Sequence, residues 1–427
     1  MDHFVVHPSG PLSGKVAVSG AKNSALKLMA ASLLAEGTFR FDNVPMNADV
    51  RVMAQTLGAI GCSVEISEPD LCVVEVPAAL EPEAPYELVT RMRASINVLG
   101  PLIGRLGRAR VALPGGDAIG SRKLDMHFQG LRAMGVDLSV RHGFIEAFVP
   151  HQLRGAVHTL PFPSVGATEN LMTAAVLAKG TTVIENAARE PEIAQLASML
   201  NRMGAEILGA GSPRIEIRGV DGLEPVDETV IPDRIEAGTF VMVCAIAGGE
   251  IEVIGARPND MDMLVAKMSE MGVLIAPTTD GLWVKRTGEL NGADVATLPH
   301  PGLATDFMPP LVAVLSVASG RSIVTENIFD GRFAFVDELV RMGAQIRTEG
   351  GHCIIKGVPR LSGAQVRALD VRAGAALVLA GTVADVPTTI HDPIHIDRGY
   401  VNLVDKLSGL GVKIERVSGD LLDYADF

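Results

Sequence analysis

Apolar residues recur along the chain with two spacings, every second residue and every 3.6 residues, and stretches of the two kinds follow one another in a repeated order. An alternating apolar run that follows a small residue and Gly predicts a strand, and an apolar period of 3.6 residues then predicts an amphipathic helix. A further Gly leads into another strand. The clear copies of this unit begin at Ala35, Ala178, Ala247, Ser319 and Val383. With a more diverged copy around Asp117, the pattern indicates six repeats across the whole chain.

One glycine closes the amphipathic helix of every copy. These glycines recur every ~70 residues, the spacing of a structural repeat, and are Gly61, Gly135, Gly204, Gly272, Gly343 and Gly411. Because a strand pattern follows each of them, we predict that each adopts the left-handed conformation that ends a helix.

A second set of helical segments lies between the amphipathic ones and is apolar on most faces, so we expect it to be buried. These segments are Asn23–Leu34, Ala94–Gly104, Ala167–Leu177, Ile235–Ala247, Phe307–Val317 and Ala373–Ala384. Twelve helices among six strand-rich units predict an α/β fold with two domains of three units, divided near Leu223 to Pro232. A coiled solenoid is the alternative, although so many buried helices favour compact domains.

Composition supports two layered domains and argues against several function classes. The 427 residues exceed one ordinary core, and with 48% apolar but only 4% aromatic residues the core must consist of aliphatic side chains. A net charge of −13 argues against a general nucleic-acid or anionic-membrane surface, so any anion would need a local basic pocket. The last stretch, Ser418 to Phe427, is typical of a loose acidic tail.

The four cysteines have no metal-site spacing and lie in apolar contexts. We therefore interpret Cys62, Cys72, Cys244 and Cys353 as buried, reduced thiols and predict no metal site. The N-terminus lacks the pattern of a signal peptide, and no apolar run reaches transmembrane length. These features predict a cytoplasmic protein without membrane insertion.

The stretch from Val111 to His127, VALPGGDAIGSRKLDMH, carries the first candidate chemistry. Its Pro-Gly-Gly turn places Asp117 at a loop tip, and Arg122 follows where a helical pattern begins. A carboxylic acid on a glycine loop near such an Arg suits proton transfer beside a bound anion. The alternative is a surface turn with a capping acid.

Several repeats place an Arg where the amphipathic helix begins. These residues are Arg122, Arg189, Arg332 and Arg398. Because helix N-termini attract anions, four arginines at equivalent positions favour a shared pocket for a polyanion. The alternative is that they are unrelated capping or surface residues. Lys22 adds a cation at another helix start, beside Asn23. The spacing of a nucleotide-triphosphate loop is absent there, which argues against that enzyme class.

These residues lie within motifs that closely resemble the family of UDP-N-acetylglucosamine 1-carboxyvinyltransferases. The motifs occur in the family's order from the first few residues to about Arg416, and they are highly specific. They read SGAKN at 19–23, RASI at 93–96, PGG-x-x-IG-x-R at 114–122, SVGATEN at 164–170, NAAREPEI at 186–193, PDRIEAGTF at 232–240 and HIDRGY at 395–400. The sibling 5-enolpyruvylshikimate-3-phosphate synthases share the fold but not these motifs.

The resemblance implies two inside-out α/β domains, each of three βαβαββ repeats, that close on substrate at their junction. It places 22–230, with the catalytic loop 112–123, in the first domain and 1–21 with 231–427 in the second. The implied reaction adds the sugar 3′-hydroxyl of UDP-N-acetylglucosamine to C2 of phosphoenolpyruvate and expels phosphate, which is the first committed step of peptidoglycan synthesis. It implies no cofactor, and we expect a monomer.

Family roles carry over to matching positions of this chain. The catalytic set becomes Asp117 as general acid, Asp306 as the base for the 3′-hydroxyl, and Lys22 and Arg398 on phosphoenolpyruvate. Arg122 shares that last role, Asn23 orients substrate, and Arg332 and Arg372 stabilise charge. The remaining residues implied to bind substrate, most of them at the uridine and diphosphate, are Arg93, Lys123, Leu124, Asp125, Met126, Phe162, Pro163, Ser164, Val165, Ile328 and Asp370.

Three departures from the family pattern matter. Asp117 stands where most members have Cys, so the general acid is kept but the thiol nucleophile is lost, and we expect resistance to fosfomycin, an epoxide that alkylates that thiol. The segment 304–310 reads ATDFMPP, which changes the neighbours of the base. Lys123 replaces the usual Pro and Asn97 a usual aromatic residue, both on the side expected to face the nucleotide.

Two other functions stay open at this point. An enolpyruvyl transferase of the same scaffold could act on another nucleotide or nucleoside in secondary metabolism. A non-catalytic UDP-sugar-binding regulator is a second alternative, although binding alone does not require both a base and an acid. Assays of phosphate release and of acceptor preference distinguish these cases.

Overall fold

The computed structural model describes residues 2–116 and 119–418 of the chain. Contacts within the chain define two units: residues 2–19, 119–121 and 232–418 form unit 1, and residues 20–116 and 122–231 form unit 2. The predicted domain limits, after residues 21 and 230, stay a prediction. Asp117 and nearly all of the predicted acidic tail lie outside the described residues.

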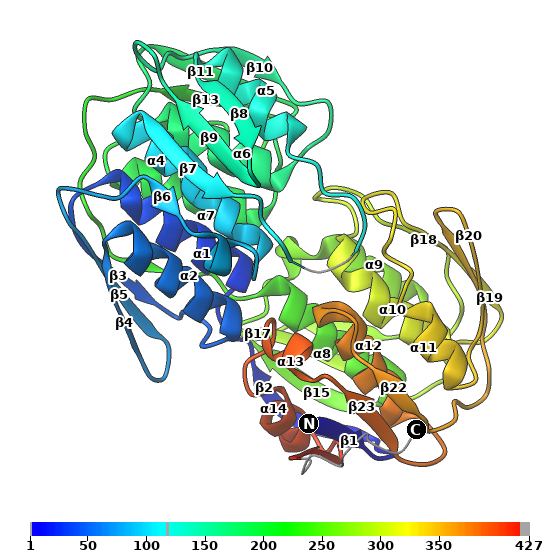
Figure 1. The fold of residues 1–427 in the computed structure, drawn as a ribbon. Coiled ribbons are helices and arrows are strands. Elements are labelled where there is room, and N and C mark those ends of the chain that lie inside the picture. The colour runs from blue at the N-terminus through cyan, green and yellow to red at the C-terminus, as the bar shows by residue number, and fades with distance from the viewer. Residues whose placement is uncertain (1, 117–118, 419–427) are drawn as a thin grey trace, which may run out of the picture. The chain divides into compact units, whose positions relative to one another are not determined.

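Unit 2 alternates short strands with helices (Figure 1). Its helices are α1 (Lys22–Ala31), α2 (Ala48–Ile60), α3 (Tyr86–Val89), α4 (Leu99–Leu106), α5 (Asp125–Ala133), α6 (Val165–Ala175) and α7 (Pro191–Arg202), with 3-10 turns η1 (Ser32–Leu34) and η2 (Arg93–Val98). Its strands are β3 (Gly37–Asp42), β4 (Ser63–Ser67), β5 (Leu71–Val76), β6 (Glu83–Ala84), β7 (Arg108–Ala112), β8 (Asp137–Arg141), β9 (Phe144–Phe148), β10 (Val157–Thr159), β11 (Thr181–Glu185), β12 (Glu206–Leu208), β13 (Arg214–Arg218) and β14 (Glu228–Thr229).

Unit 1 repeats the same alternation (Figure 1). Its helices are α8 (Arg234–Ala247), α9 (Asp262–Glu270), α10 (Met308–Leu315), α11 (Val336–Arg341), α12 (Val371–Thr382), α13 (Ile394–Asp397) and α14 (Leu403–Gly409), with η3 (Pro258–Asp260) and η4 (Thr305–Phe307). Its strands are β1 (His3–Val6), β2 (Leu12–Ala17), β15 (Gly249–Ile254), β16 (Leu274–Pro277), β17 (Gly281–Arg286), β18 (Val295–Ala296), β19 (Arg321–Thr325), β20 (Gln345–Glu349), β21 (His352–Lys356), β22 (Gln365–Arg367), β23 (Thr388–His391) and β24 (Ile414–Val417).

The strands of the described residues form six four-stranded sheets, three in each unit. Each sheet combines one parallel edge pair with two antiparallel pairs, as in the order β10-β11-β13-β12. The six sheets confirm the six repeats that the apolar pattern predicted. The other orders are β14-β3-β5-β4, β6-β7-β9-β8, β16-β17-β15-β2, β18-β19-β21-β20 and β22-β23-β1-β24.

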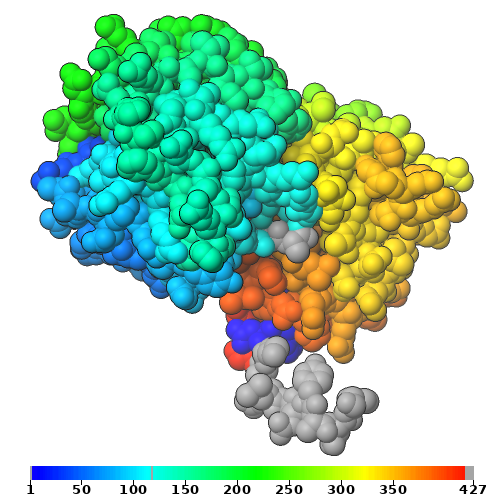
Figure 2. Space-filling model, turned by 45° about the horizontal axis from the view of Figure 1, so that its top comes forward, coloured from blue at the N-terminus to red at the C-terminus, as the bar shows by residue number. Residues whose placement is uncertain are grey.

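The N-terminal segment completes two sheets of unit 1. Strand β1 lies between β23 and β24, with His3 opposite both His391 and Val417, and β2 runs parallel to β15. Figure 2 shows the same neighbourhood on the surface, where the blue N-terminal residues lie beside orange and red C-terminal ones. One sheet of unit 1 therefore joins the two ends of the unit's sequence through β1, and another joins β2 to the strands β15, β16 and β17 that follow α8.

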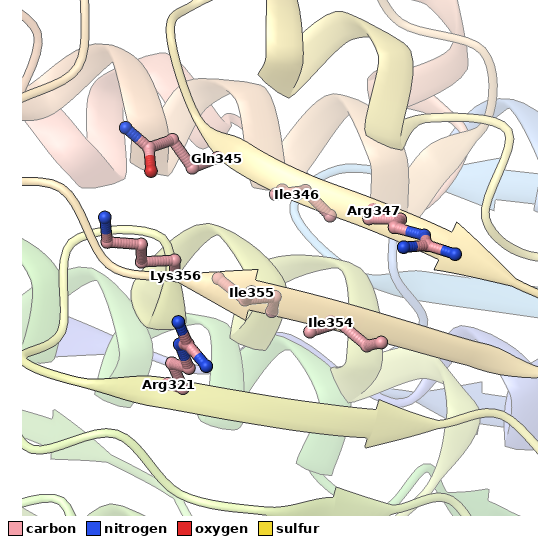
Figure 3. A pocket seen from close by; sticks show the side chains of 7 residues that line it. All are labelled: Arg321, Gln345, Ile346, Arg347, Ile354, Ile355 and Lys356. Atoms are coloured by element: carbon pink, nitrogen blue, oxygen red, sulfur yellow. The ribbon is translucent and has the colours of Figure 1, made fainter.

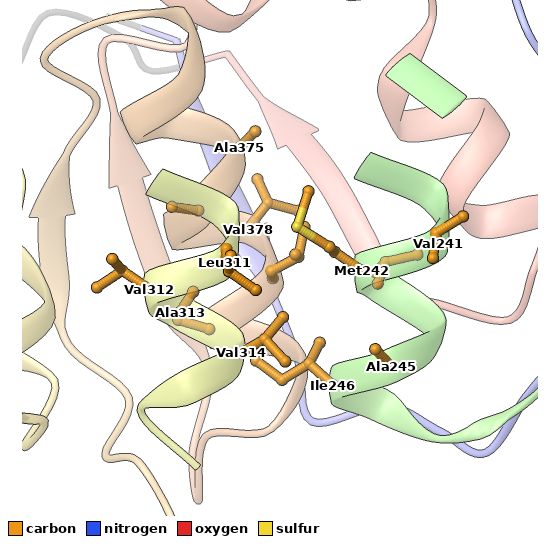
Figure 4. Packing of buried hydrophobic residues seen from close by; sticks show 14 of the residues in the cluster. Val241, Met242, Ala245, Ile246, Leu311, Val312, Ala313, Val314, Ala375 and Val378 are labelled. Carbon is orange, nitrogen blue, oxygen red and sulfur yellow. The ribbon is translucent and has the colours of Figure 1, made fainter. Parts of the chain in front are cut away.

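Buried helices occupy the centre of unit 1, and its sheets lie outside them. Apolar side chains of α8, α10 and α12 interdigitate in the cluster drawn in Figure 4, among them Met242, Leu311 and Val378. Gly238 permits the close approach of α8, because a Cβ atom there would lie 2.4 Å from Cε1 of Phe307. Strand β21 alternates exposed and buried residues, as expected for a sheet with one face on this core. The predicted burial of the apolar helices is confirmed.

The predicted glycine caps are also confirmed. All six repeat glycines have positive φ, for example 112° at Gly61, where the chain leaves α2. A residue with a Cβ is strained in that conformation, which explains why the repeat requires glycine there.

In three of the sheets, an asparagine one or two residues after an inner strand is bonded to the end of the parallel edge strand of the same sheet. The Nδ2 groups of Asn43, Asn186 and Asn327 donate to backbone oxygens of Val230, Leu160 and Thr297, respectively, at 2.8, 2.9 and 3.0 Å. Each accepting residue lies at or just beyond the C-terminal end of the parallel edge strand. The asparagine therefore fixes the connection that follows the central strand.

None of the helices in the part of the chain that the structure describes has the length and apolar character needed to span a membrane.

Candidate active site

Asp306 lies in unit 1 in a cluster of buried guanidinium groups. Its Oδ1 accepts a hydrogen bond from Nη2 of Arg332 at 3.1 Å, and its Oδ2 accepts one from Nε of Arg372 at 3.0 Å. Both arginines are 3% exposed. The structure thus brings together three residues that the sequence separates by 26 and 66 positions.

The two arginines retain unused donors. Nε of Arg332 and Nη1 of Arg372 are buried and have no hydrogen-bond partner among the described residues. The glycine of the turn at 397–400 lies close, because a Cβ atom on Gly399 would be 3.4 Å from Nη1 of Arg372, and Arg398 precedes it in the chain. Unsatisfied buried donors are costly, so an anionic ligand is the natural partner for this cluster.

The aromatic ring of Tyr400 packs against the guanidinium group of Arg372, a contact that was not identified from sequence. The Arg372 guanidinium carbon lies 5.2 Å from the centre of the Tyr400 ring. The Tyr400 hydroxyl lies 2.9 Å from Oγ1 of Thr239, whose own hydrogen is donated to the backbone oxygen of Ile235. Tyr400 is therefore the donor in that pair, and burial raises the pKa of its phenol.

Two further predicted residues of unit 1 have clear local positions. Asp370 caps α12, where its Oδ1 accepts hydrogen bonds from the backbone N–H groups of Arg372 and Ala373 at 2.8 and 3.1 Å. The cap orients the first turn of the helix that carries Arg372. Ile328 lies in the turn after β19, and its backbone N–H donates to Oε1 of Glu326 at 2.7 Å.

In unit 2, Lys22 is the first residue of α1, whose N-terminus has no side-chain cap. Its Nζ lies 2.8 Å from Oδ2 of Asp49, and both residues are buried. Asn23 follows in the same helical turn, and its backbone oxygen accepts a hydrogen bond from Lys27 at 2.9 Å. The arrangement holds a cation at an uncapped helix N-terminus, where anions are favoured.

The end of the glycine loop packs against two predicted arginines of unit 2. Nη2 of Arg93 donates to the backbone oxygen of Arg122. Gly116 has φ 113°, a conformation that strains other residues, and a Cβ there would lie 2.7 Å from Nη2 of Arg122 and 3.1 Å from Cβ of Arg93. Burial, followed by the positive charge of Arg122, lowers the pKa of Arg93 to about 10. A site with two such cations favours an anion.

The predicted uridine-diphosphate segments lie at the starts of two helices of unit 2. Asp125 and Met126 begin α5, directly after Lys123 and the buried Leu124. The other segment ends at Val165, the first residue of α6. There Ser164 caps the helix by accepting a hydrogen bond from the backbone N–H of Ala167 at 3.3 Å, and Phe162, followed by Pro163, is 38% exposed.

His127, in the first turn of α5, was not identified from sequence. The backbone N–H of Gly100 donates to Oδ1 of Asn170 at 2.8 Å, so the Nδ2 group of Asn170 is the donor toward Nδ1 of His127, 3.1 Å away. Nδ1 then accepts, and the proton lies on Nε2. A Cβ atom on Gly166, in the first turn of α6, would be 3.3 Å from that Nε2. The imidazole therefore lies beside the start of α6 with its donor nitrogen on that side.

We expect His127 to stay neutral and to make folding stability fall with acid. Burial, then the charge of Arg93, lowers its pKa from 6.5 to about 4, although Asp125 opposes this. The unfolded chain takes up the proton first, so this contribution is complete above pH 6.5 and is lost progressively as the pH falls toward 4. It amounts to about 3 kcal/mol.

Nuclear magnetic resonance titration of the imidazole and urea unfolding at several pH values check this expectation. A His127→Gln variant should lose this part of the pH dependence, while His151→Gln, at an exposed position, should keep it. A His127 imidazole that titrates near pH 6.5 would contradict the argument.

Asn97 is one of the departures from the family pattern. It belongs to a buried polar group that also contains Glu169 and Lys27 of α1. Its Nδ2 donates to Oε2 of Glu169 at 2.6 Å, and Lys27 lies 3.4 Å from Oε1 of the same carboxylate. Burial raises the pKa of Glu169. The Asn97 side chain is thus 5% exposed and is directed at a buried carboxylate, whereas we had expected it on the side that faces the nucleotide.

A surface hollow of about 370 Å³ lies over β19, β21 and β20 (Figure 3). Its lining includes Arg321, Arg347 and Lys356, and none of the predicted site residues. It is therefore separate from the Asp306 cluster. In the described residues, no group of His, Cys, Asp and Glu side chains has the arrangement of a metal site.

Known proteins that resemble this chain provide independent information. The model of the family described as EPSP synthase (3-phosphoshikimate 1-carboxyvinyltransferase) matches residues 6–407. A UDP-N-acetylglucosamine 1-carboxyvinyltransferase of Mycolicibacterium paratuberculosis is 49% identical over 97% of this chain and 99% of its own length. The UDP-N-acetylglucosamine 1-carboxyvinyltransferase 2 of Carboxydothermus hydrogenoformans is 50% identical over 98% of this chain and all of its own length.

Solved structures show the same fold at lower sequence identity. The enolpyruvyl transferase NikO from Streptomyces tendae superposes with a TM-score of 0.87 at 24% identity, over 98% of this chain and 99% of its own. EPSP synthase from Acinetobacter baumannii gives 0.76 at 20% identity, over 98% of this chain and all of its own. These matches confirm the predicted inside-out α/β architecture. The chain belongs to the EPSP synthase family and, within it, to the UDP-N-acetylglucosamine 1-carboxyvinyltransferases.

Proposed function

We propose that this chain transfers the enolpyruvyl group of phosphoenolpyruvate to the 3′-hydroxyl of UDP-N-acetylglucosamine, the first committed step of peptidoglycan synthesis. The 3′-oxygen forms a bond to C2 of phosphoenolpyruvate as C3 gains a proton. The tetrahedral adduct then loses phosphate from C2 and a proton from C3, which leaves an enol ether. Both substrates carry several negative charges, and the reaction consumes no oxidant or reductant.

The observation that best supports this proposal is the Asp306 cluster. Asp306 lies between two buried guanidinium groups, and one donor on each, Nε of Arg332 and Nη1 of Arg372, has no hydrogen-bond partner among the described residues. Such a cluster suits an anionic substrate and holds a carboxylate that can accept a proton. Binding of an anion alone requires no carboxylate there, because Asp306 occupies two further guanidinium donors that an anion could otherwise use.

We assign the chemical roles as follows. Asp306 accepts the proton of the 3′-hydroxyl, and Asp117 delivers a proton to C3 of phosphoenolpyruvate. Lys22, Arg122 and Arg398 bind the phosphate and carboxylate of phosphoenolpyruvate. The helix starts around Ser164 and Asp125, with Arg93 and Ile328, bind the uridine diphosphate group. Each assignment rests on position in the family motifs together with the local charges described above.

We further propose that the enzyme acts in the cytoplasm as a monomer, without metal or organic cofactor. All four cysteines are free thiols in buried positions, which suits a reducing compartment. The relatives that share about half of this sequence carry the name of the UDP-N-acetylglucosamine enzyme, which favours this acceptor over other nucleotides.

Phosphate release from phosphoenolpyruvate by the purified chain tests the proposal. We expect release only when UDP-N-acetylglucosamine is also present, and no loss of activity with a chelator. A panel of other nucleosides and UDP-sugars in place of the acceptor tests the alternative of a paralogue with another substrate. Faster release with one of those compounds would assign that acceptor instead, and tight UDP-N-acetylglucosamine binding without release would assign a binding protein.

A further inference from the structure

The acidic residue that precedes the repeat asparagine is more deeply buried in one repeat, the one that contains β19, than in two others. Three repeats carry an acidic residue directly before the asparagine that ties the sheet edge: Asp42, Glu185 and Glu326. Asp42 and Glu185 pair with surface arginines, and their side chains are 45% and 37% exposed. Glu326 is only 7% exposed and forms no ion pair among the described residues. The repeat framework therefore does not account for the burial of Glu326.

The carboxylate of Glu326 joins two turns. Its Oε1 accepts hydrogen bonds from the backbone N–H groups of Ile328 and Phe329 at 2.7 and 3.1 Å. Its Oε2 accepts one from the hydroxyl of Thr305 at 2.9 Å, and Thr305 directly precedes Asp306 in η4. An ionised carboxylate can accept all three bonds at once, which no neutral side chain of this size does.

Both turns are otherwise anchored in unit 1. The Asn327 backbone N–H donates to Oγ1 of Thr297 at 3.0 Å, and its side chain donates to the backbone oxygen of the same residue, also at 3.0 Å. Asp306 is held by its two arginines. Between these anchored points, the bond from Thr305 to Glu326 links the turn of the base to the turn of Ile328.

We propose that Glu326 is a positioning residue that sets the base, Asp306, relative to the turn that contacts the nucleotide acceptor. This inference rests on the proposed function, in which Ile328 binds the nucleotide and Asp306 takes the 3′-proton. Because Glu326 touches neither substrate in this role, it acts through Thr305 and through the backbone of residues 328 and 329. The 304–310 segment keeps Thr305 and Asp306, although the residues on either side of this pair differ from the family pattern.

The test compares Thr305→Val, Thr305→Ser, Glu326→Gln and the double variant Thr305→Val with Glu326→Gln. Valine replaces the hydroxyl with a methyl group of similar size, serine keeps the hydroxyl, and the amide oxygen of glutamine still accepts from the backbone of the 328–329 turn. Glu185→Gln, at the equivalent repeat position, is the matched control, and thermal unfolding of every variant monitors folding. Kinetic constants are measured separately for each substrate.

We expect Thr305→Val to lower kcat roughly tenfold, the effect of losing a hydrogen bond to a charged group, with the KM of phosphoenolpyruvate unchanged. Glu326→Gln should give a similar loss of kcat and also raise the KM of UDP-N-acetylglucosamine. The double variant should be no worse than Glu326→Gln, because both changes break one link. Thr305→Ser and Glu185→Gln should resemble the wild type.

Wild-type kinetic constants in Thr305→Val overturn the proposal, and so do additive effects in the double variant or an equal rise in both KM values. If Glu326→Gln does not fold, Thr305→Val and Thr305→Ser still decide the point. The wild type is assayed in parallel, so absence of turnover with UDP-N-acetylglucosamine refutes the proposed function rather than the role of Glu326. In that event, calorimetry compares the affinity of Thr305→Val for UDP-N-acetylglucosamine with that of the wild type. A weaker affinity supports a role of the link in positioning the acceptor turn, and an unchanged affinity overturns it.

Discussion

Replacement of Asp306 by Asn is expected to lower kcat by roughly 10² to 10⁴-fold, the usual contribution of a general base. Asparagine retains the size of the side chain but cannot take the proton of the 3′-hydroxyl. It also removes the carboxylate that Arg332 and Arg372 share, so phosphoenolpyruvate should bind at least as tightly as in the wild type. A fall in kcat without loss of affinity for that anion separates a chemical role from disturbed folding.

Steady-state kinetics and calorimetric titration of phosphoenolpyruvate check this result. The matched control is Asp294→Asn, at an exposed position where the side chain accepts a hydrogen bond from the backbone N–H of Ile323 and where asparagine can do the same. We expect it to retain full activity. An Asp306→Asn enzyme with a kcat within tenfold of the wild type would refute the assignment of the base.

Fosfomycin should leave the wild-type enzyme active and should inactivate an Asp117→Cys variant completely and irreversibly. The drug is an epoxide that a thiolate opens, and a carboxylate is a much poorer nucleophile for it. The native cysteines offer no substitute, because all four are buried and burial raises their pKa values to about 11 or 12. Asp117 lies outside the described residues, so this prediction rests on its place in the sequence.

Mass spectrometry after incubation with the drug checks for the adduct, and phosphate release measures the remaining activity. Asp117→Asn is the complementary variant, and it should lose turnover by roughly 10² to 10⁴-fold because it cannot donate the proton to C3. Near-full turnover in Asp117→Asn would refute the acid role. A covalent adduct on the wild-type chain would refute the predicted resistance.

Much of the fold could be predicted from sequence, because the residues that end the helices and those that make them buried are recognisable within each repeat. A glycine such as Gly61 is required wherever a helix ends in the left-handed conformation, and the apolar helices such as α8 show their burial on every face. The partners of β1 could not be derived from the apolar pattern, since its neighbours β23 and β24 lie almost a whole chain away. Only the resemblance indicated where the N-terminal segment belongs.

The candidate site was less accessible to reasoning from residues alone. Motif positions identified Asp306, but no sequence periodicity reports that its partners are Arg332 and Arg372. The proton position on His127 depends on Asn170, and the role of Tyr400 depends on Thr239. Glu326 did leave a signal, an acidic residue before the repeat asparagine. The same signal occurs at Asp42 and Glu185, so sequence could not tell which of the three is buried.

Direct identification of the reaction product tests the central claim most sharply. The purified chain is incubated with carbon-13-labelled phosphoenolpyruvate and UDP-N-acetylglucosamine, and the product is examined by nuclear magnetic resonance and mass spectrometry. We predict one equivalent of inorganic phosphate for each enol ether formed, with the labelled carbon C2 bonded to the 3′-oxygen of the sugar. An unchanged UDP-N-acetylglucosamine in the presence of folded protein and phosphoenolpyruvate would contradict the account.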